Sequence, residues 1–304
     1  MHMHPYRPPL HAYLALATSM ALVGSYVALS KPLLGAFPVF VLAWLRFAIG
    51  AVAMAPWLRK PVGEPAMSRR THARLFAQSW FGNFWFSICM LFGVKHTPAS
   101  QAGVIMAALP AVVALFSAWL LRERLQARAV LAIGLAVAGI MLYAGSTPDG
   151  RSGQGCWGPL LIAAAVCCEA LYVVIGKSLS AELSAKRVSA LINLWGLALM
   201  TPLAIWEWVH TSIARPSLPM LALLLFYGLA ASVWTVWLWM HGLRHVDAHR
   251  AGVFTVMLPV SAAAFGVWVL SETLSPVQML AFGLALAGVW MVTWPSRRDL
   301  AKQA

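Results

Sequence analysis

The segment HTPASQAGVIMAALPAVVALFSAWLLRERLQARAVLAIGLAVAG at His96–Gly139 returns later in the chain as HVDAHRAGVFTVMLPVSAAAFGVWVLSETLSPVQMLAFGLALAG at His245–Gly288. The two copies align without a gap at a shift of 149 residues, and 20 of the 44 aligned positions are identical. Pro110 is matched by Pro259 among these positions. An apolar composition alone gives far fewer matches, so the pattern predicts an internal structural repeat.

The composition of the whole chain predicts that this repeat lies in a membrane. Of the 304 residues, 61% are hydrophobic and only 10% are charged, and the mean hydropathy is +0.76. A soluble fold of this length would leave much of that apolar surface in water. A membrane-spanning helix needs about 20 apolar residues. We therefore expect an all-α integral membrane protein with ten transmembrane helices, approximately at 10–30, 37–57, 75–94, 98–121, 127–146, 157–177, 188–208, 219–241, 248–270 and 277–294.

The basic residues are distributed unevenly between the two ends of these predicted helices. A formal net charge of +13 would suggest a nucleic-acid partner in a soluble chain. Here 17 lysines and arginines lie in loops on one side of the predicted membrane and four on the other, and no basic patch with stacking aromatic residues forms. The positive-inside rule then predicts a bacterial-type inner (plasma) membrane protein with both termini in the cytoplasm. The same pattern argues against nucleic-acid binding.

The duplication divides the predicted helices into two sets of five. A shift of 146 residues aligns the earlier helices more weakly and pairs Tyr26 with Tyr172. Because five is an odd number, the second copy must cross the membrane in the opposite sense to the first. We therefore expect an inverted-topology repeat, formed by residues 1–150 and 151–304, as in many secondary transporters.

The repeated motifs resemble those of the drug/metabolite transporter superfamily, in particular its ten-helix EamA-type members. In that family each half has a proline in its fourth helix, a Glu-Arg-Leu-like turn and a glycine-spaced fifth helix. The second copy here departs from the pattern, with Thr273 in place of the arginine. The matching positions in this chain are Pro110, Glu123–Leu125 and Gly134–Gly139, and again Pro259, Glu272–Leu274 and Gly283–Gly288.

The resemblance implies a central cavity lined by helices 1, 3, 4, 6, 8 and 9, with helices 5 and 10 at the periphery. Relatives include exporters of amino acids, some of them aromatic, and exchangers of nucleotide sugars or sugar phosphates. We expect a transporter that exports or exchanges small metabolites, above all amino acids, by alternating access. Exchange of other metabolites or drugs is an alternative. An intramembrane enzyme is a weaker one, because the chain has no HExxH, GxSxG, membrane aspartate pair or P-loop.

Glu169 is the most informative side chain, because it lies near the middle of the sixth predicted helix. A carboxylate at that depth is costly unless it faces a water-filled cavity or a partner. It could pair with a substrate ammonium group or couple transport to protons. It could equally be tied to a neighbouring helix in a structural role.

Aromatic and polar side chains of the predicted helices complete the expected substrate-binding set. Aromatic walls with a few amides and hydroxyls suit an amphipathic or aromatic solute, and aromatic faces also attract cations. Packing between helices is the alternative for each tryptophan, since tryptophan is common in membrane proteins. With Glu169, the predicted set is Tyr26, Asn83, Phe84, Trp85, Ser87, Tyr172, Trp234 and Trp237.

Other intramembrane residues have structural interpretations. We expect Pro110 and Pro259 to kink their helices and to act as hinges. Arg46 could meet a substrate carboxylate, but a later start of the second helix would leave it at the outer interface, and we favour that interpretation. Glu123 and Glu272 end their helices beside tight turns, and we expect each to cap the next helix.

Histidines spaced by four, at His241, His245 and His249, bear a superficial likeness to a zinc-binding HExxH motif. Val246 stands where the catalytic glutamate belongs, and the stretch overlaps a predicted turn. We therefore predict no metal site and no cofactor. The expected partners are a small-molecule substrate and the lipid bilayer.

Overall fold

The fold is a bundle of helices, and no strand occurs in the part of the chain that the structure describes. That part of the computed structural model comprises residues 10–60, 66–121, 131, 134–135, 138, 157–179, 183–211, 215–243, 245, 254, 257–273 and 275–293.

The helices of the first half follow the predicted spans closely. Two of them are interrupted: the third predicted span contains a π-helical segment, and the fourth is divided by a turn at Ala107–Ala108. The elements are α1 (Leu10–Ala36), α2 (Val39–Ala53), the 3₁₀ turn η1 (Ala55–Leu58), α3 (Arg69–Ser79), the π-helical segment η2 (Trp80–Trp85), α4 (Phe86–Lys95), α5 (Ala99–Met106) and α6 (Leu109–Leu121).

The second half also contains an interrupted helix, in which a π-helical segment separates two α-helical parts. Its elements are α8 (Trp157–Leu179), α9 (Ala185–His210), α10 (Leu218–Leu229), the π-helical segment η4 (Ala230–Trp234), α11 (Thr235–Leu243), α13 (Met257–Trp268) and α14 (Pro276–Thr293).

Four described helices are long and apolar enough to cross a membrane: Leu10–Ala36, Trp157–Gly176, Ala185–His210 and Leu218–Gly242. Shorter apolar helices lie at Val39–Ala53, Gln101–Phe116 and Met257–Trp268. The fifth predicted span, 127–146, lies almost entirely outside the described residues. The all-α membrane fold is therefore confirmed, and the count of ten helices stays a prediction.

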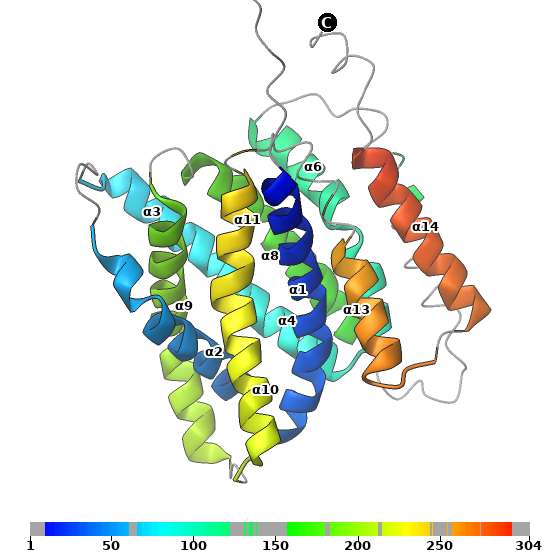
Figure 1. Ribbon diagram of the computed structural model, residues 1–304, viewed down its shortest axis with the longest axis horizontal. Helices are drawn as coiled ribbons and strands as arrows, with labels where there is room; N and C mark the ends of the chain where they lie inside the picture. Colours follow the sequence, from blue (N-terminus) through cyan, green and yellow to red (C-terminus); the bar gives the residue numbers. More distant parts are fainter. Residues whose placement is uncertain are drawn as a thin grey trace, which may run out of the picture.

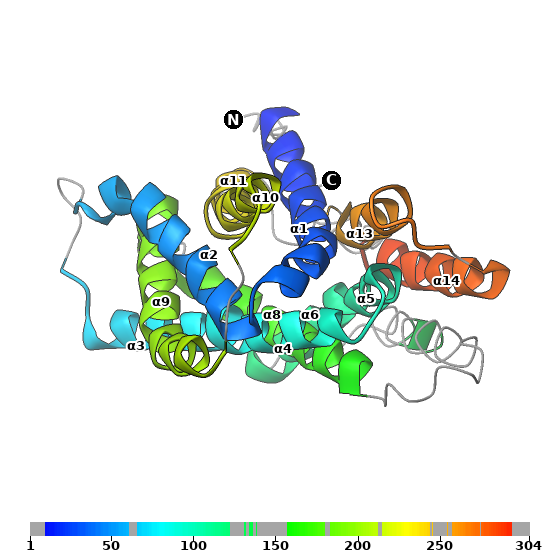
Figure 2. The same ribbon diagram turned by 90° about the horizontal axis from the view of Figure 1, so that it is seen from below.

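Helices from distant parts of the sequence pack against one another. α1 contacts both α11 and α13, α2 contacts α9, and α4 contacts α8. α14 lies at one edge of the molecule, where it packs against α5 and α6 (Figures 1 and 2). The core between the helices is apolar and includes Leu16, Phe47, Leu91 and Ile162, each at most 1% exposed.

Helix starts differ between the two ends of the bundle. Ser68 precedes α3, and its side chain accepts a hydrogen bond from the Thr71 N–H at 3.1 Å. Ser184 caps α9 in the same way, with the Arg187 N–H at 3.3 Å. These caps satisfy N–H groups that the first turn of a helix leaves free. By contrast, α2 and α5 begin after prolines, whose side chains cannot accept a hydrogen bond.

Candidate functional site

Arg46 lies inside the bundle rather than at an interface. α2 begins at Val39, so the later helix start that we favoured is wrong. The Arg46 side chain is only 4% exposed, and its Nη2 donates to the Ser87 Oγ on α4 at 3.0 Å. Its Nε has no hydrogen-bond partner among the described residues. A buried guanidinium with an unused donor can bind a further acceptor.

Glu169 on α8 lies close enough to Arg46 for the two charges to act on one another. Within the described part of the chain no ion pair joins the Glu169 carboxylate to the Arg46 guanidinium, so the two groups are not in direct contact. Glu169 also keeps part of its surface exposed. The bundle thus contains two opposite charges that are held apart.

Three tyrosines surround these two charges. Tyr26 and Tyr172 lie within electrostatic range of Glu169, and the Tyr227 hydroxyl interacts with the Arg46 guanidinium. The rings of Tyr26 and Tyr227 meet edge to face, with their centroids 5.9 Å apart. The three tyrosines come from α1, α8 and α10, so the cluster is formed by both halves of the chain.

The π-helical segment η2 forms one wall of this region. Gly82 packs so closely on the Tyr172 ring that an added Cβ would overlap it. Next to it, Asn83 donates from Nδ2 to the Ile192 carbonyl at 2.7 Å. The Ser87 hydroxyl donates to the Asn83 carbonyl while it accepts from Arg46. Asn83 and Ser87 therefore hold η2 and α4 in place beside the two charges.

A second buried polar group packs against α8, one helical turn beyond Tyr172. Gln78 on α3 is fully buried, and neither its amide nitrogen nor its amide oxygen has a hydrogen-bond partner among the described residues. Its Nε2 packs against Gly176. Buried amides are normally hydrogen-bonded, so Gln78 and the Arg46 Nε are the polar groups best placed to receive a ligand or water.

The predicted aromatic residues separate into two groups. Phe84 stacks on Trp80 with ring centroids 5.1 Å apart, and Trp85 meets Phe84 edge to face at 5.5 Å. Trp234 and Trp237 lie on the other interrupted helix, are 38% and 37% exposed, and contact Phe226 and His241.

Of the predicted set, the structure brings Tyr26, Ser87 and Glu169 close to Arg46, and Tyr172 close to Glu169. Tyr227 was missed, because only packing reveals which intramembrane hydroxyl faces a charge.

The two prolines that we expected to act as hinges lie at helix starts. Pro110 is the second residue of α6, directly after the turn that divides α5 from α6. Pro259 is the third residue of α13, and its carbonyl lies against Gly103 of α5. Whether they act as hinges stays a prediction.

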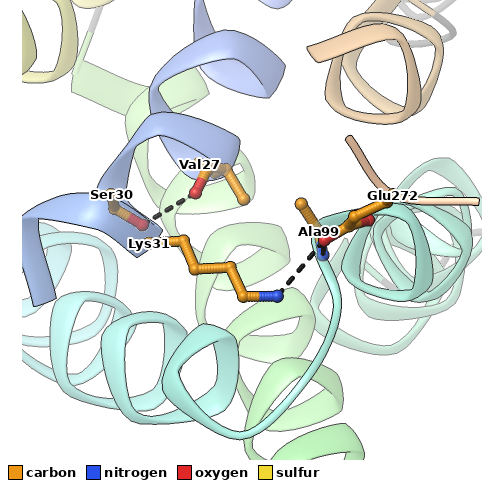
Figure 3. Close-up of polar contacts among 5 residues, drawn as sticks. All are labelled: Val27, Ser30, Lys31, Ala99 and Glu272. Atoms are coloured by element: carbon orange, nitrogen blue, oxygen red, sulfur yellow. Dashed lines mark hydrogen bonds and ion pairs between the residues drawn. The ribbon is translucent and has the colours of Figure 1, made fainter. Parts of the chain in front are cut away.

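Glu272, which we expected to cap the next helix, caps a helix of the first half of the chain. Its Oε1 accepts from the Ala99 N–H of α5 at 2.8 Å and from the Lys31 Nζ at 3.2 Å (Figure 3). Glu207 acts in the same way on α2, since its Oε2 accepts from the N–H groups of Phe40 and Val41 at 2.7 and 3.0 Å. Glu123, the counterpart of Glu272 in the repeat, was expected to cap the next helix and lies outside the described residues.

Comparison with known proteins places these observations in context. A model of the EamA-like transporter family matches the chain twice, over residues 10–145 and 156–294. The uncharacterised transporter YetK of Bacillus subtilis is 33% identical over 284 residues, which cover 92% of this chain and 86% of YetK. The aromatic amino acid exporter YddG of Ancylobacter novellus is 31% identical over 147 residues, which cover 48% of this chain and 50% of YddG. One crystal structure has a TM-score of 0.67 at 21% identity and covers 94% of this chain and 98% of its own, which indicates a shared fold.

Proposed function

The chain belongs to the EamA-like transporter family, as its repeated motifs predicted, and from this premise we propose that it exports or exchanges amino acids, with a preference for aromatic or apolar ones. It is a membrane-embedded, multi-pass protein, and the family favours transport over intramembrane catalysis. The observation that carries the proposal is the unpaired placement of Arg46 and Glu169 inside the bundle.

Two opposite charges within electrostatic range of one another suit a zwitterion. Arg46 would bind the substrate carboxylate, for which its planar fork is well shaped and its Nε has a free donor. Glu169 would accept hydrogen bonds from the substrate ammonium group. Burial of either charge without a partner is costly in a membrane protein, so a substrate that satisfies both at once is bound selectively.

The surroundings of the two charges suit an aromatic or apolar side chain. Tyr26, Tyr172 and Tyr227 are at most 9% exposed and supply ring faces with polar edges, which can pack on an apolar group. The name of the Ancylobacter relative, an aromatic amino acid exporter, supports this choice of side chain.

Alternating access between two inverted repeats of five helices is part of the proposal. Three observations support it. The family model matches the chain twice. The 149-residue shift relates Trp85, the last residue of η2, to Trp234, the last residue of η4. Two hydrogen bonds are also related by the shifts: Asn83 to the Ile192 carbonyl, and Ser232 to the Arg46 carbonyl at 3.3 Å.

Counterflow in proteoliposomes tests the proposal. Vesicles loaded with unlabelled phenylalanine should accumulate labelled phenylalanine. Arg46→Lys and Glu169→Gln should each lower uptake roughly 10- to 100-fold, the value of one hydrogen bond to a charged group. The variants should differ in the competitors they accept: Glu169→Gln should lose discrimination against phenylpropionate, which lacks the ammonium group, and Arg46→Lys against phenethylamine, which lacks the carboxylate.

Matched controls separate these effects from misfolding. Arg59→Gln changes an exposed arginine, and Cys167→Ser changes an exposed residue two positions before Glu169. Both should transport like the wild type. Unchanged transport by both site variants would refute the zwitterion site. Transport of sugar phosphates or nucleotide sugars alone, with no effect of Glu169→Gln, would favour the exchanger alternative, in which Arg46 binds an anion.

A further inference from the structure

Three histidines converge where α1 begins and α11 ends. His11 lies in the first turn of α1, His241 in the last turn of α11, and His245 just beyond it. Their ring centroids are 5.2 to 5.6 Å apart in all three pairings. α1 and α11 pack along each other, as Figure 1 also shows, so the two helices fix this arrangement.

We propose that His11, His241 and His245 form a binding site for a divalent transition-metal ion, with Zn²⁺ as the best fit. Each residue offers one ring nitrogen, and these three atoms lie within 4.8 Å of one another. Tetrahedral zinc with Zn–N bonds of about 2.0–2.1 Å needs them about 3.4 Å apart. Small side-chain rotations close that difference.

The hydrogen bonding of His245 favours metal binding. Its Nδ1 lies 3.0 Å from the His241 carbonyl oxygen, which can only accept a hydrogen bond, so Nδ1 carries the proton. Its Nε2 is then the unprotonated nitrogen that a metal requires. A ring N–H held by a carbonyl is the usual second partner of a zinc-ligating histidine, because it fixes the tautomer and the ring orientation.

The composition of the cluster also limits which ions can bind there. Three imidazoles in mutual contact repel one another when protonated, and the described residues place no carboxylate in the cluster. Imidazole ligands select zinc, copper or nickel over magnesium or calcium. His11 is exposed and the other two are partly exposed, so an ion can enter from water and a water molecule can occupy the fourth position.

This site differs from the one that the sequence pattern suggested. The sequence pattern offered His249 as the third ligand beside His241 and His245. A predicted turn in this stretch argued against those three histidines as ligands of one metal ion. The structure instead supplies His11, which lies 230 residues before His241 in the chain. The metal would join the first helix of the chain to a helix of its second half, and would stabilise the contact between them.

Metal titration of the purified full-length chain tests the site, with a purification tag that contains no histidine. Co²⁺ should bind one equivalent per chain and give the intense visible absorption of four-coordinate cobalt, and Zn²⁺ should displace it. His11→Gln, His241→Gln and His245→Gln should each weaken Co²⁺ binding roughly 10- to 100-fold or more. Zn²⁺ should raise the melting temperature of the wild type but of none of these variants.

Controls keep the result independent of folding and of other histidines. His72→Gln and His210→Gln, at exposed positions of α3 and α9, should bind Co²⁺ like the wild type. Each variant should melt at the wild-type temperature without metal. Equal Co²⁺ affinity of the wild type and the triple variant would overturn the proposal, as would loss of binding when only His2, His4 and His249 are replaced. The site does not depend on the transported substrate, so its failure leaves the proposed function untouched.

Discussion

At the scale of single residues, Gly24 sets how closely α1 and α13 approach. A Cβ at this position would overlap the Ser261 side chain and the Leu258 carbonyl, and would lie 2.7 Å from the Ala262 nitrogen. Two of these three atoms belong to the backbone of α13, which cannot move aside as a flexible side chain can. Small residues at such crossings let the backbones of membrane helices pack directly.

We predict that Gly24→Ala destabilises the protein by about 1–3 kcal/mol, the usual cost of an added methyl group in a packed core. Gly35→Ala is the matched control on the same helix, because nothing lies within 4 Å of its Cβ position. In thermal unfolding in detergent, Gly24→Ala should melt several degrees below the wild type, and Gly35→Ala should not. Equal melting temperatures for the two variants would contradict the close α1–α13 contact.

The site residues differ in how far the sequence predicted them. Glu169 could be identified because a carboxylate inside an apolar run is costly wherever it points. Arg46 could not, because the same cost is avoided if a long side chain reaches the interface. Its partners, Ser87 and Tyr227, come from helices distant in the sequence, so only packing decides between the two cases.

At the scale of helices, two starts depend on glutamates from the other half of the chain. α2 and α5 begin after Pro38 and Pro98, neither of which caps the helix with its side chain. Glu207 and Glu272 supply the missing acceptors across helix contacts. A carboxylate at a helix N-terminus is also favoured by the helix dipole. These contacts link the two halves at one end of the bundle.

The cap and the ion pair of Glu272 can be separated by mutation. We predict that Glu272→Ala lowers stability by about 1 kcal/mol, because it removes the acceptor for the Ala99 N–H. Lys31→Met removes only the ion pair, and the Lys31 side chain is 37% exposed, so it should cost a few tenths of a kcal/mol at most. Thermal unfolding of both variants checks which of them loses more stability. A larger loss for Lys31→Met would show that the ion pair, and not the cap, holds this end together.

Hydropathy located the described helices but not their interruptions. The segments η2 and η4 arise where the backbone hydrogen-bond register changes within an apolar run, and apolar composition carries no signal for that change. The turn between α5 and α6 had a signal in Pro110, because proline has no N–H to donate to the carbonyl four residues earlier and so interrupts a helix there. Capping across helix contacts had no signal in the sequence, because Glu272 and Ala99 are far apart in the chain.

At the scale of the whole molecule, the charged site does not follow the repeat. Under the 146-residue shift Arg46 corresponds to Ile192 and Glu169 to Val23, so each charge has an apolar counterpart. Two hydrogen bonds between helices are related by the shifts, whereas the charges are not. A dipolar substrate held between Arg46 and Glu169 would therefore bind in one orientation, although the sequences of the two halves are related.

The predicted inversion of two halves of similar hydropathy would leave the orientation of the chain in the membrane to its loop charges. The 17 basic residues on one side of the predicted membrane against four on the other favour the orientation with both termini in the cytoplasm. We predict that green fluorescent protein fused after Ala304 fluoresces in bacterial cells, and that alkaline phosphatase fused there is inactive. Replacing Arg69, Arg70 and Arg74 with glutamine should reduce this bias and send part of the population into the opposite orientation. Active phosphatase on the unmodified chain would contradict the predicted orientation.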